Sequence, residues 1–345
     1  MKIGWATMAD LLRDPVTGTL MSQAERHRMI VEGAVAAERA GFWCASVGEH
    51  HFCDYVVSSP PVLLAAIAER TSTIRVGTAV ALGTNNDPIR QAEDYATLDL
   101  LSDGRVELVV GRGNLYEHTF TAFGQDPAVS REMYQEKLQL LVAALSEEQL
   151  DWSGDHRPPF RNFTTQPRPL QQNMPIWVGG GSSIESAEFA AQEGLPLMLP
   201  GVFGPPSIFI PIVERYRELW ADLGHPEENC RIGTIAHTFI APTSQEAFAI
   251  AAPRFDVYMK WVRDLLRMSS PHLGDMIRET DLRVMTERGP TVCGSKEEVI
   301  EKMSLYRDLL GLDVYLLMCD LGGMPANELD ESLAMFGEDV VTHFH

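Results

Sequence analysis

The sequence predicts a closed (β/α)8 barrel, an α/β fold, formed by a single domain over residues 1–345. Eight apolar segments of strand length alternate with helical segments, and no internal repeat or shift in composition marks a domain boundary. The GxGxxG fingerprint of dinucleotide-binding folds is missing after the first strand. An alternating order also fits an open doubly wound sheet, but the count of eight favours the barrel.

The first half of the chain supplies four strands and the helices that connect them. The strands are expected at residues 2–7, 42–47, 74–82 and 105–110. The capping box Ser22–Glu25 begins the first helix, which ends at Gly41. Ser-Pro at 59–60 and Asp-Pro at 87–88 begin the next two helices, because these residues suit the N-cap and the first helical position.

The second half continues the alternation. Its strands are expected at residues 175–178, 195–199, 231–241 and 313–319. Its helices are expected at 130–145, 207–223 and 328–336, and a further helix follows Ser183 and ends at residue 192. Capping boxes at Thr243–Glu246 and Ser295–Glu298 begin two further helices. Residues 151–169 are polar, rich in proline and expected to be irregular. Residues from about 268 to 290 have no clear period, so we treat them as an insertion and a candidate mobile segment.

Composition and charge exclude several classes of protein. The formal net charge is −20 and no local basic patch is present, so nucleic acid and anionic membranes are poor partners. The five cysteines form no CxxC pair and no metal-ligand spacing. No apolar run approaches ~18 residues, and the N-terminus enters a strand without a signal segment. We expect a cytoplasmic protein with no bound metal.

Two glycine-rich segments are candidates for binding a phosphate. Arg112 lies between two glycines just after strand 105–110 and offers a forked positive charge. Gly179 to Ser183 joins a strand to a helix, where backbone amides and hydroxyls, including that of Ser186, can face an anion. Alternatively, the arginine is a surface residue and the serines only cap the helix. At one barrel mouth, both segments could grip the same phosphate.

Glu49, His50 and His51 follow the second strand and could form an acid/base pair, a metal site or a structural cluster. Adjacent strand residues point to opposite faces, which disfavours a metal held by both histidines. A histidine beside a carboxylate suits a general base. A buried, hydrogen-bonded histidine with its neighbour on the surface is the alternative.

The sequence resembles bacterial luciferase and the luciferase-like flavin monooxygenases. The matching segments, in order, are EHHF at 49–52, VGTAVALGTNNDPIRQAED at 76–94, SDGR and GRG within 102–113, FG at 123–124, PIWVGGGSS and AEFAAQEGLP within 175–196, and ESLAMFGEDV at 331–340. The resemblance implies a (β/α)8 barrel with insertions.

The resemblance also implies roles for individual residues. Glu49 and His50 would lie beside the flavin, with His50 as the catalytic base, and Ala79-Val80 would form a cis peptide under the ring. The residues implied at the phosphate are Arg112, Gly180, Gly181, Ser182 and Ser186. The chain departs from luciferase at Gly111, where luciferase has a reactive cysteine, and at Pro200-Gly201, where it has a tryptophan.

By this resemblance the chain is expected to be a flavin-dependent monooxygenase. Reduced FMN, supplied by a separate flavin reductase, would react with O2 to a C4a-peroxyflavin that oxidises an aldehyde, a ketone or another small organic substrate. One alternative is an F420-dependent oxidoreductase of the same superfamily, which transfers hydride. Another is a non-catalytic flavin-binding protein. The resemblance suggests a homodimer.

Overall fold

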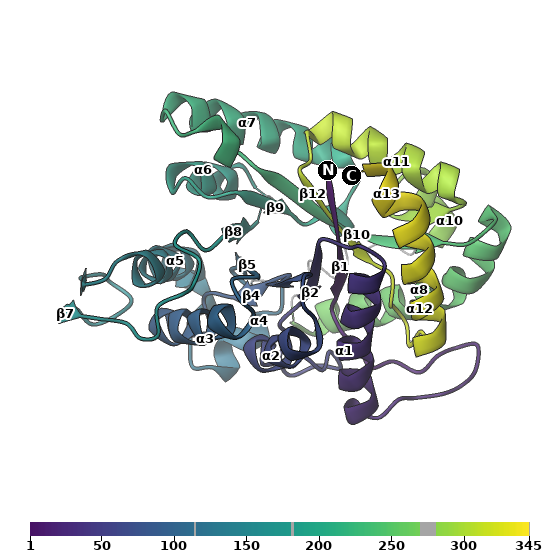
Figure 1. Cartoon of the computed structure of the whole chain (residues 1–345), viewed down its shortest axis with the longest axis horizontal. Helices are drawn as coiled ribbons and strands as arrows, with labels where there is room; N and C mark the ends of the chain where they lie inside the picture. Colours follow the sequence, from purple (N-terminus) through teal and green to yellow (C-terminus); the bar gives the residue numbers. More distant parts are fainter. Residues whose placement is uncertain (114, 181–182, 270–280, 345) are drawn as a thin grey trace.

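The computed structural model describes residues 1–113, 115–180, 183–269 and 281–344, in which eight parallel strands close into a barrel (Figure 1). These strands, in order around the barrel, are β1 (Lys2–Thr7), β2 (Cys44–Val47), β3 (Arg75–Thr78), β5 (Val106–Gly111), β8 (Ile176–Gly179), β9 (Leu197–Leu199), β10 (Ile232–Ile240) and β12 (Val314–Met318). Pairing of β12 with β1, and of β10 with β9 and β12, completes the closure. The predicted (β/α)8 barrel is confirmed.

Helices surround the barrel and begin largely where the sequence predicts. They are α1 (Gln23–Arg39), α2 (Pro60–Arg70), α3 (Pro88–Leu101), α5 (Ser130–Ser146), α6 (Ile184–Gln192), α7 (Ile210–Asp222), α8 (Ser244–Ser269), α11 (Lys296–Leu310) and α12 (Ala326–Met335). Both hydrogen bonds of the capping boxes at Ser22 and Ser295 form, and the carboxylate of Asp87 accepts from two backbone amides. Ser59 makes no side-chain cap.

Several elements differ from the sequence-based expectations. The strand expected over 74–82 is two strands, β3 and β4 (Ala81–Leu82), interrupted at Ala79-Val80. Within the region expected to be irregular, β6 (Leu150–Trp152) and β7 (Phe160–Phe163) form an antiparallel hairpin. Residues 270–280 of the expected insertion lie outside the described residues. Further elements are α4 (Glu117–Ala122), α10 (Leu282–Glu287), β11 (Val292–Gly294), α13 (Thr342–Phe344), the 3-10 turns η1 (Pro127–Val129), η2 (Gly201–Phe203), η3 (Pro206–Phe209) and η4 (Glu227–Asn229), and the π-helical η5 (Phe336–Val341).

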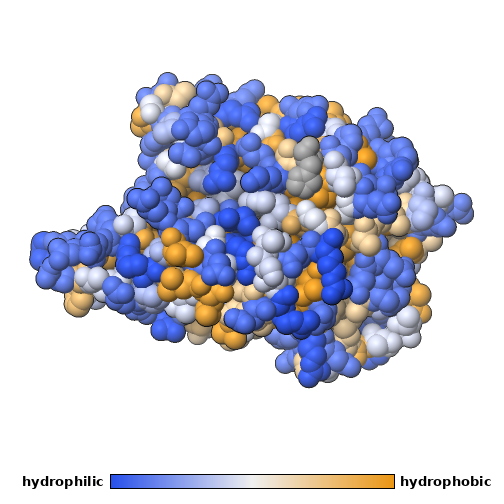
Figure 2. Space-filling view, viewed as in Figure 1, coloured by the Kyte–Doolittle hydropathy of each residue, from blue (hydrophilic) through white to orange (hydrophobic). Residues whose placement is uncertain are grey.

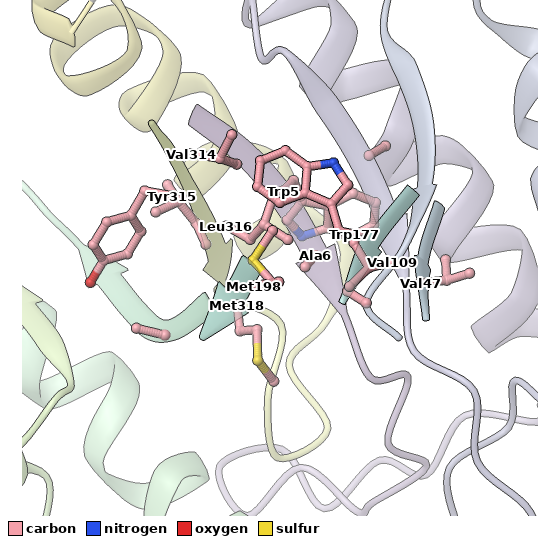
Figure 3. Packing of buried hydrophobic residues seen from close by; sticks show 14 of the residues in the cluster. Trp5, Ala6, Val47, Val109, Trp177, Met198, Val314, Tyr315, Leu316 and Met318 are labelled. Carbon is pink, nitrogen blue, oxygen red and sulfur yellow. The ribbon is translucent and has the colours of Figure 1, made fainter. Parts of the chain in front are cut away.

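The core is a continuous cluster of buried apolar side chains, among them Trp5 and Trp177 (Figure 3). The indole N–H of Trp177 donates to the buried carboxylate of Glu107 at 2.9 Å, which also pairs with Arg75 at 2.7 Å. The face of the molecule shown in Figure 2 is mostly hydrophilic, with apolar residues gathered in smaller patches. No helix among the described residues is long and apolar enough to cross a membrane.

A buried arginine ties three distant segments together. Arg254 of α8 is 1% exposed, and its Nε lies 3.0 Å from Oδ1 of the buried Asp14, in the connection between β1 and α1. Its Nη2 donates to Glu328 of α12 at 3.0 Å. Because both carboxylates hydrogen-bond this buried cation, the cluster fixes α8 against the β1–α1 connection and against α12.

A second buried cluster stands at the carboxyl end of β1. Arg26 of α1 pairs with Asp320 at 2.7 Å, and the hydroxyl of Thr7 donates to the same carboxylate at 2.6 Å. Asp10 accepts from the backbone of Gly323 at 3.2 Å. Burial raises the pKa of Asp10 to about 6; Arg26 opposes this shift and Asp320 adds to it.

Replacing Arg254 by methionine should strongly destabilise the protein. The variant leaves the Asp14 carboxylate buried without its guanidinium, which costs about 3–5 kcal/mol of unfolding free energy. Urea denaturation measures the loss. The control is Arg70→Met, because Arg70 pairs with Glu32 on the exposed surface and its loss should cost about 1 kcal/mol or less. Equal losses in the two variants would contradict the assignment.

The free energy of unfolding of Asp10→Asn, measured relative to that of wild type, should increase as pH rises. Folded Asp10 keeps its proton up to about pH 6, whereas the unfolded carboxyl releases it near about pH 4. Raising the pH through this window therefore destabilises wild type at this site, while the neutral amide is unaffected. Urea unfolding at about pH 4.5 and about pH 7.5 measures the difference. The exposed Asp308→Asn should show no such rise, and a constant difference for Asp10→Asn would refute the prediction.

Candidate active site

The two predicted phosphate-binding segments leave neighbouring strands at one rim of the barrel. β5 and β8 pair in register through Gly111 and Gly179, the residues that precede Arg112 and Gly180. This rim is formed by the carboxyl ends of the strands, the end at which (β/α)8 barrels carry their active sites. The structure therefore brings Arg112 and Gly180 together.

Glu49 holds the rim together through its carboxylate. Its Oε2 accepts from the backbone N–H of Leu82 at 2.8 Å. Its Oε1 accepts from the Asn86 amide at 3.0 Å and lies 2.9 Å from Nε2 of His51. Its own N–H donates to the carbonyl of Val80 at 2.9 Å. These contacts occupy both carboxylate oxygens, so Glu49 is suited to positioning the loop rather than to moving protons.

His50 lies apart from the Glu49 carboxylate. Its ring stacks on Tyr55 with 4.1 Å between ring centroids and meets Tyr116 edge-on at 5.7 Å. Its buried Nδ1 has no hydrogen-bond partner in the described part of the chain. Burial lowers the pKa of His50 to about 3, and His51 adds to this shift. The imidazole is therefore neutral near pH 7 and can accept a proton.

Aromatic side chains continue from His50. The hydroxyls of Tyr55 and Tyr258 lie 2.8 Å apart, and Trp261 packs edge-on against Tyr55 at 4.6 Å between ring centroids. Phe52 and Phe123 are exposed and lie 5.6 Å apart. Together these five aromatic residues form what we call the aromatic wall. An aromatic wall suits an apolar organic ligand and limits the access of water.

The peptide bond between Ala79 and Val80 is cis, as the resemblance implies. It separates β3 from β4 at the rim. Ala79 is buried, whereas Val80 is partly exposed.

Arg112 is half-buried at the rim. Burial lowers the pKa of its guanidinium, and Arg131 of α5 adds to this shift while Glu132 opposes it. Within residues 1–113, 115–180, 183–269 and 281–344, its guanidinium forms no ion pair. Arg131 makes one long contact with Glu185 of α6, at 3.8 Å. The positive charge of Arg131 therefore acts on Arg112, and the Glu132 carboxylate partly offsets it.

Gly180 and Ser186 form the described part of the second segment. The hydroxyl of Ser186 donates to the carbonyl of Ser183 at 2.8 Å. A Cβ atom at Gly180 would lie 3.2 Å from Cβ of Ser186, so the turn packs closely on the start of α6. Gly181 and Ser182, also predicted to bind the phosphate, lie outside the described residues.

Helix α5 supplies functional residues that sequence reasoning missed. Besides Arg131, the hydroxyl of Tyr134 donates to the carbonyl of Val110 at 2.8 Å, and Nζ of Lys137 donates to the carbonyls of Thr84 and Asn86. No motif marks these residues. The available signal is their position near the start of α5, the first long helix after β5.

A hollow of about 550 Å³ lies between α5, the C-terminal end of α6 and the β6–β7 connection. Its lining includes the carboxylates of Glu132, Glu136, Asp155 and Glu193. Glu136 accepts from the backbone N–H groups of Asp155 and His156, which fastens the hairpin to α5. The surface beyond Arg131 is therefore acidic.

Known proteins resemble the chain along most of its length. A flavin-dependent trigonelline monooxygenase, oxygenase component, from Acinetobacter baylyi is 25% identical over 323 residues, covering 87% of this chain and 85% of the relative. The crystal structure of monooxygenase RslO1 from Streptomyces bottropensis superposes with a TM-score of 0.85, at 24% identity and full coverage of both chains.

Two other solved structures share the fold and carry different cofactors. The oxygenating constituent of 3,6-diketocamphane monooxygenase from Pseudomonas putida, in complex with FMN, has a TM-score of 0.79 at 19% identity, covering 99% of this chain and 98% of that one. An F420-dependent secondary alcohol dehydrogenase has a TM-score of 0.75 at 18% identity, covering 98% of each chain.

Family membership follows from a match that covers nearly the whole chain. The family described as luciferase-like monooxygenase matches residues 1–312. The barrel, the cis peptide and the paired rim segments accord with that match. The chain belongs to the luciferase-like monooxygenase family.

Proposed function

We propose that the chain is the oxygenase of a two-component system that uses reduced FMN and O2 to oxidise a small organic substrate. The observation that carries this proposal is Arg112, a half-buried guanidinium that forms no ion pair in the described part of the chain and lies beside the Gly180 turn. Such a cation gains from an anionic ligand, and the terminal phosphate of FMN supplies one; Arg131 adds positive charge nearby. The oxygenase component among its relatives supports a separate flavin reductase as the donor.

The acidic surroundings favour FMN over F420. F420 carries a carboxylate-rich tail beyond its phosphate, which would extend toward a surface that bears Glu132, Glu136 and Asp155. Like charges in this region would oppose that tail. FMN ends at its phosphate and meets no such repulsion.

The chain's own residues would divide the work as follows. Arg112, Arg131, Gly180 and Ser186 would hold the phosphate. Ala79 and Val80 would line the site of the flavin ring, and Glu49 keeps their loop in place through its hydrogen bonds. Reduced flavin supplies the electrons that activate O2. His50, neutral and with an unpartnered Nδ1, exchanges a proton with the reacting groups. The aromatic wall excludes water and receives the substrate.

Anaerobic titration followed by mixing with O2 tests the function. Reduced FMN should bind more tightly than reduced F420, and mixing its complex with O2 should give a long-lived absorbance transient. Candidate aldehydes and ketones should then be oxidised with incorporation of labelled oxygen. Preferential binding of F420, or oxidation of bound FMN as fast as free FMN, would refute the proposal. Binding of FMN with no turnover of any substrate would support a non-catalytic flavin-binding protein.

His50→Ala should lower turnover about 10²–10⁴-fold while FMN affinity stays within about threefold, because general bases contribute this much to rate. Stopped-flow kinetics and flavin titration separate the two effects. Because burial holds the pKa of His50 near 3, wild-type kcat/KM should show no step from this residue between about pH 5 and about pH 8. The exposed His27→Ala is the control. Unchanged turnover in His50→Ala would remove this residue from the mechanism.

Arg112→Gln should reduce FMN affinity about tenfold or more, since a hydrogen bond to a charged group contributes about 1.5–3 kcal/mol. Riboflavin lacks the phosphate, so its affinity should stay nearly unchanged. Fluorescence titration with both ligands measures the preference. Arg215→Gln, on the surface of α7, should alter neither affinity. An equal loss for FMN and riboflavin would place Arg112 away from the phosphate.

A further inference from the structure

Val80 occupies the space that two neighbouring strands leave open. A Cβ atom built on Gly111 would lie 2.6 Å from Cγ2 of Val80, and one built on Gly179 would lie 2.6 Å from Cγ1. Carbon atoms that are not bonded rest about 3.5–4.0 Å apart. Neither strand position can therefore carry a side chain while Val80 keeps its place.

The two glycines are explained by this contact and not by backbone conformation. Gly113, on the same loop, has a φ of +78°, which favours glycine, whereas Gly111 and Gly179 are not among the residues with positive φ. Any residue could adopt their backbone. Because Gly111 and Gly179 pair in register, their missing side chains create one gap between β5 and β8, and both methyl groups of Val80 enter it.

The gap lies between the elements of the candidate active site. Gly111 directly precedes Arg112, Gly179 directly precedes Gly180, and the carbonyl of Val80 accepts from Glu49. Val80 is partly exposed, so a ligand at the rim can contact it. If the Val80 side chain moved out of the gap, it would occupy space at the barrel rim and make the candidate site shallower.

We propose that Val80 is a specificity-determining residue that sets the depth of the flavin-ring site, and that Gly111 and Gly179 are required to admit its side chain. The identity of the ligand rests on the proposed function, whereas the steric relation does not. Adding a side chain at 111 pushes Val80 toward the ligand. Shortening Val80 to alanine removes the 2.6 Å conflict with Cγ2 and leaves a close contact of 3.2 Å between the two Cβ atoms.

A double-mutant cycle on the protein without flavin tests the steric relation. Gly111→Ala should lower the midpoint of thermal unfolding by about 2–6 °C, because overpacking a core is destabilising. Val80→Ala should lower it through lost packing. The double variant should melt above Gly111→Ala, since the alanine at 111 then fills the vacated space. Additive losses in the double variant would overturn the proposal.

Gly77→Ala is the matched control. A Cβ atom at this strand glycine would lie 2.8 Å from the carbonyl oxygen of Glu107, and Val80 is not among its nearest contacts. The losses of stability caused by Gly77→Ala and Val80→Ala should therefore simply add in the double variant. If Val80→Ala instead restored the stability of Gly77→Ala as much as that of Gly111→Ala, its effect would be general and the specific contact would be overturned.

Flavin titration of the same variants tests specificity. Gly111→Ala should weaken FMN binding about tenfold, and the double variant should recover to within about threefold of Val80→Ala. If wild type binds FMN and Gly111→Ala binds it equally well, the proposed effect on depth is wrong. If wild type fails to bind FMN, the proposed function is wrong, and the thermal cycle still decides whether Val80 requires the two glycines.

Discussion

Closure of the parallel sheet is the constraint on which the candidate site depends. Hydrogen bonds between β12 and β1, and between β9, β10 and β12, leave no open edge among the eight barrel strands. All eight strands run in one direction, so their carboxyl ends form a single rim. Residues as distant in sequence as Glu49, Arg112 and Gly180 therefore share one mouth, where an open sheet would have spread them along an edge.

The charge distribution has a local meaning that the net charge of −20 conceals. An acidic chain repels anions at long range, yet the half-buried Arg112 at the rim forms no ion pair in the described part of the chain, and Arg131 adds positive charge near it. Short-range hydrogen bonds from guanidinium groups can outweigh the screened repulsion of distant carboxylates. Under the proposed function, the acidic residues around the nearby hollow would disfavour a ligand that carries charges beyond its phosphate.

The sequence predicted the alternation of strands and helices and several helix starts, because buried strands and N-caps follow local rules. Asp87, for example, caps α3 through its own side chain. The interruption of the strand at Ala79-Val80 could not be predicted from local sequence, because the apolar run continues without a break to Leu82. Only the family resemblance indicated it. The β6–β7 hairpin was also missed, since its strands are only three and four residues long and the connection between them is held by the distant Glu136.

In the candidate site, too, some features follow from local sequence and others from tertiary packing. The location of Arg112 and Gly180 at the rim was predictable, because each follows the end of a strand and has glycine neighbours. Arg131 and the separate environments of Glu49 and His50 depend on packing between elements far apart in the sequence. The residues alone left open which histidine contacts Glu49; in the structure its carboxylate contacts His51, whereas His50 stacks on Tyr55.

Helix α5 contacts the mouth at three levels along one face. Arg131 adds positive charge near Arg112, Tyr134 binds the end of β5, and Lys137 binds the loop after β4. A helix moves nearly as a rigid rod, so any displacement of α5 carries all three groups at once. Anchoring of the ligand and the shape of its entrance are thus mechanically coupled, and substitutions on the outer face of α5 can reach both without touching either.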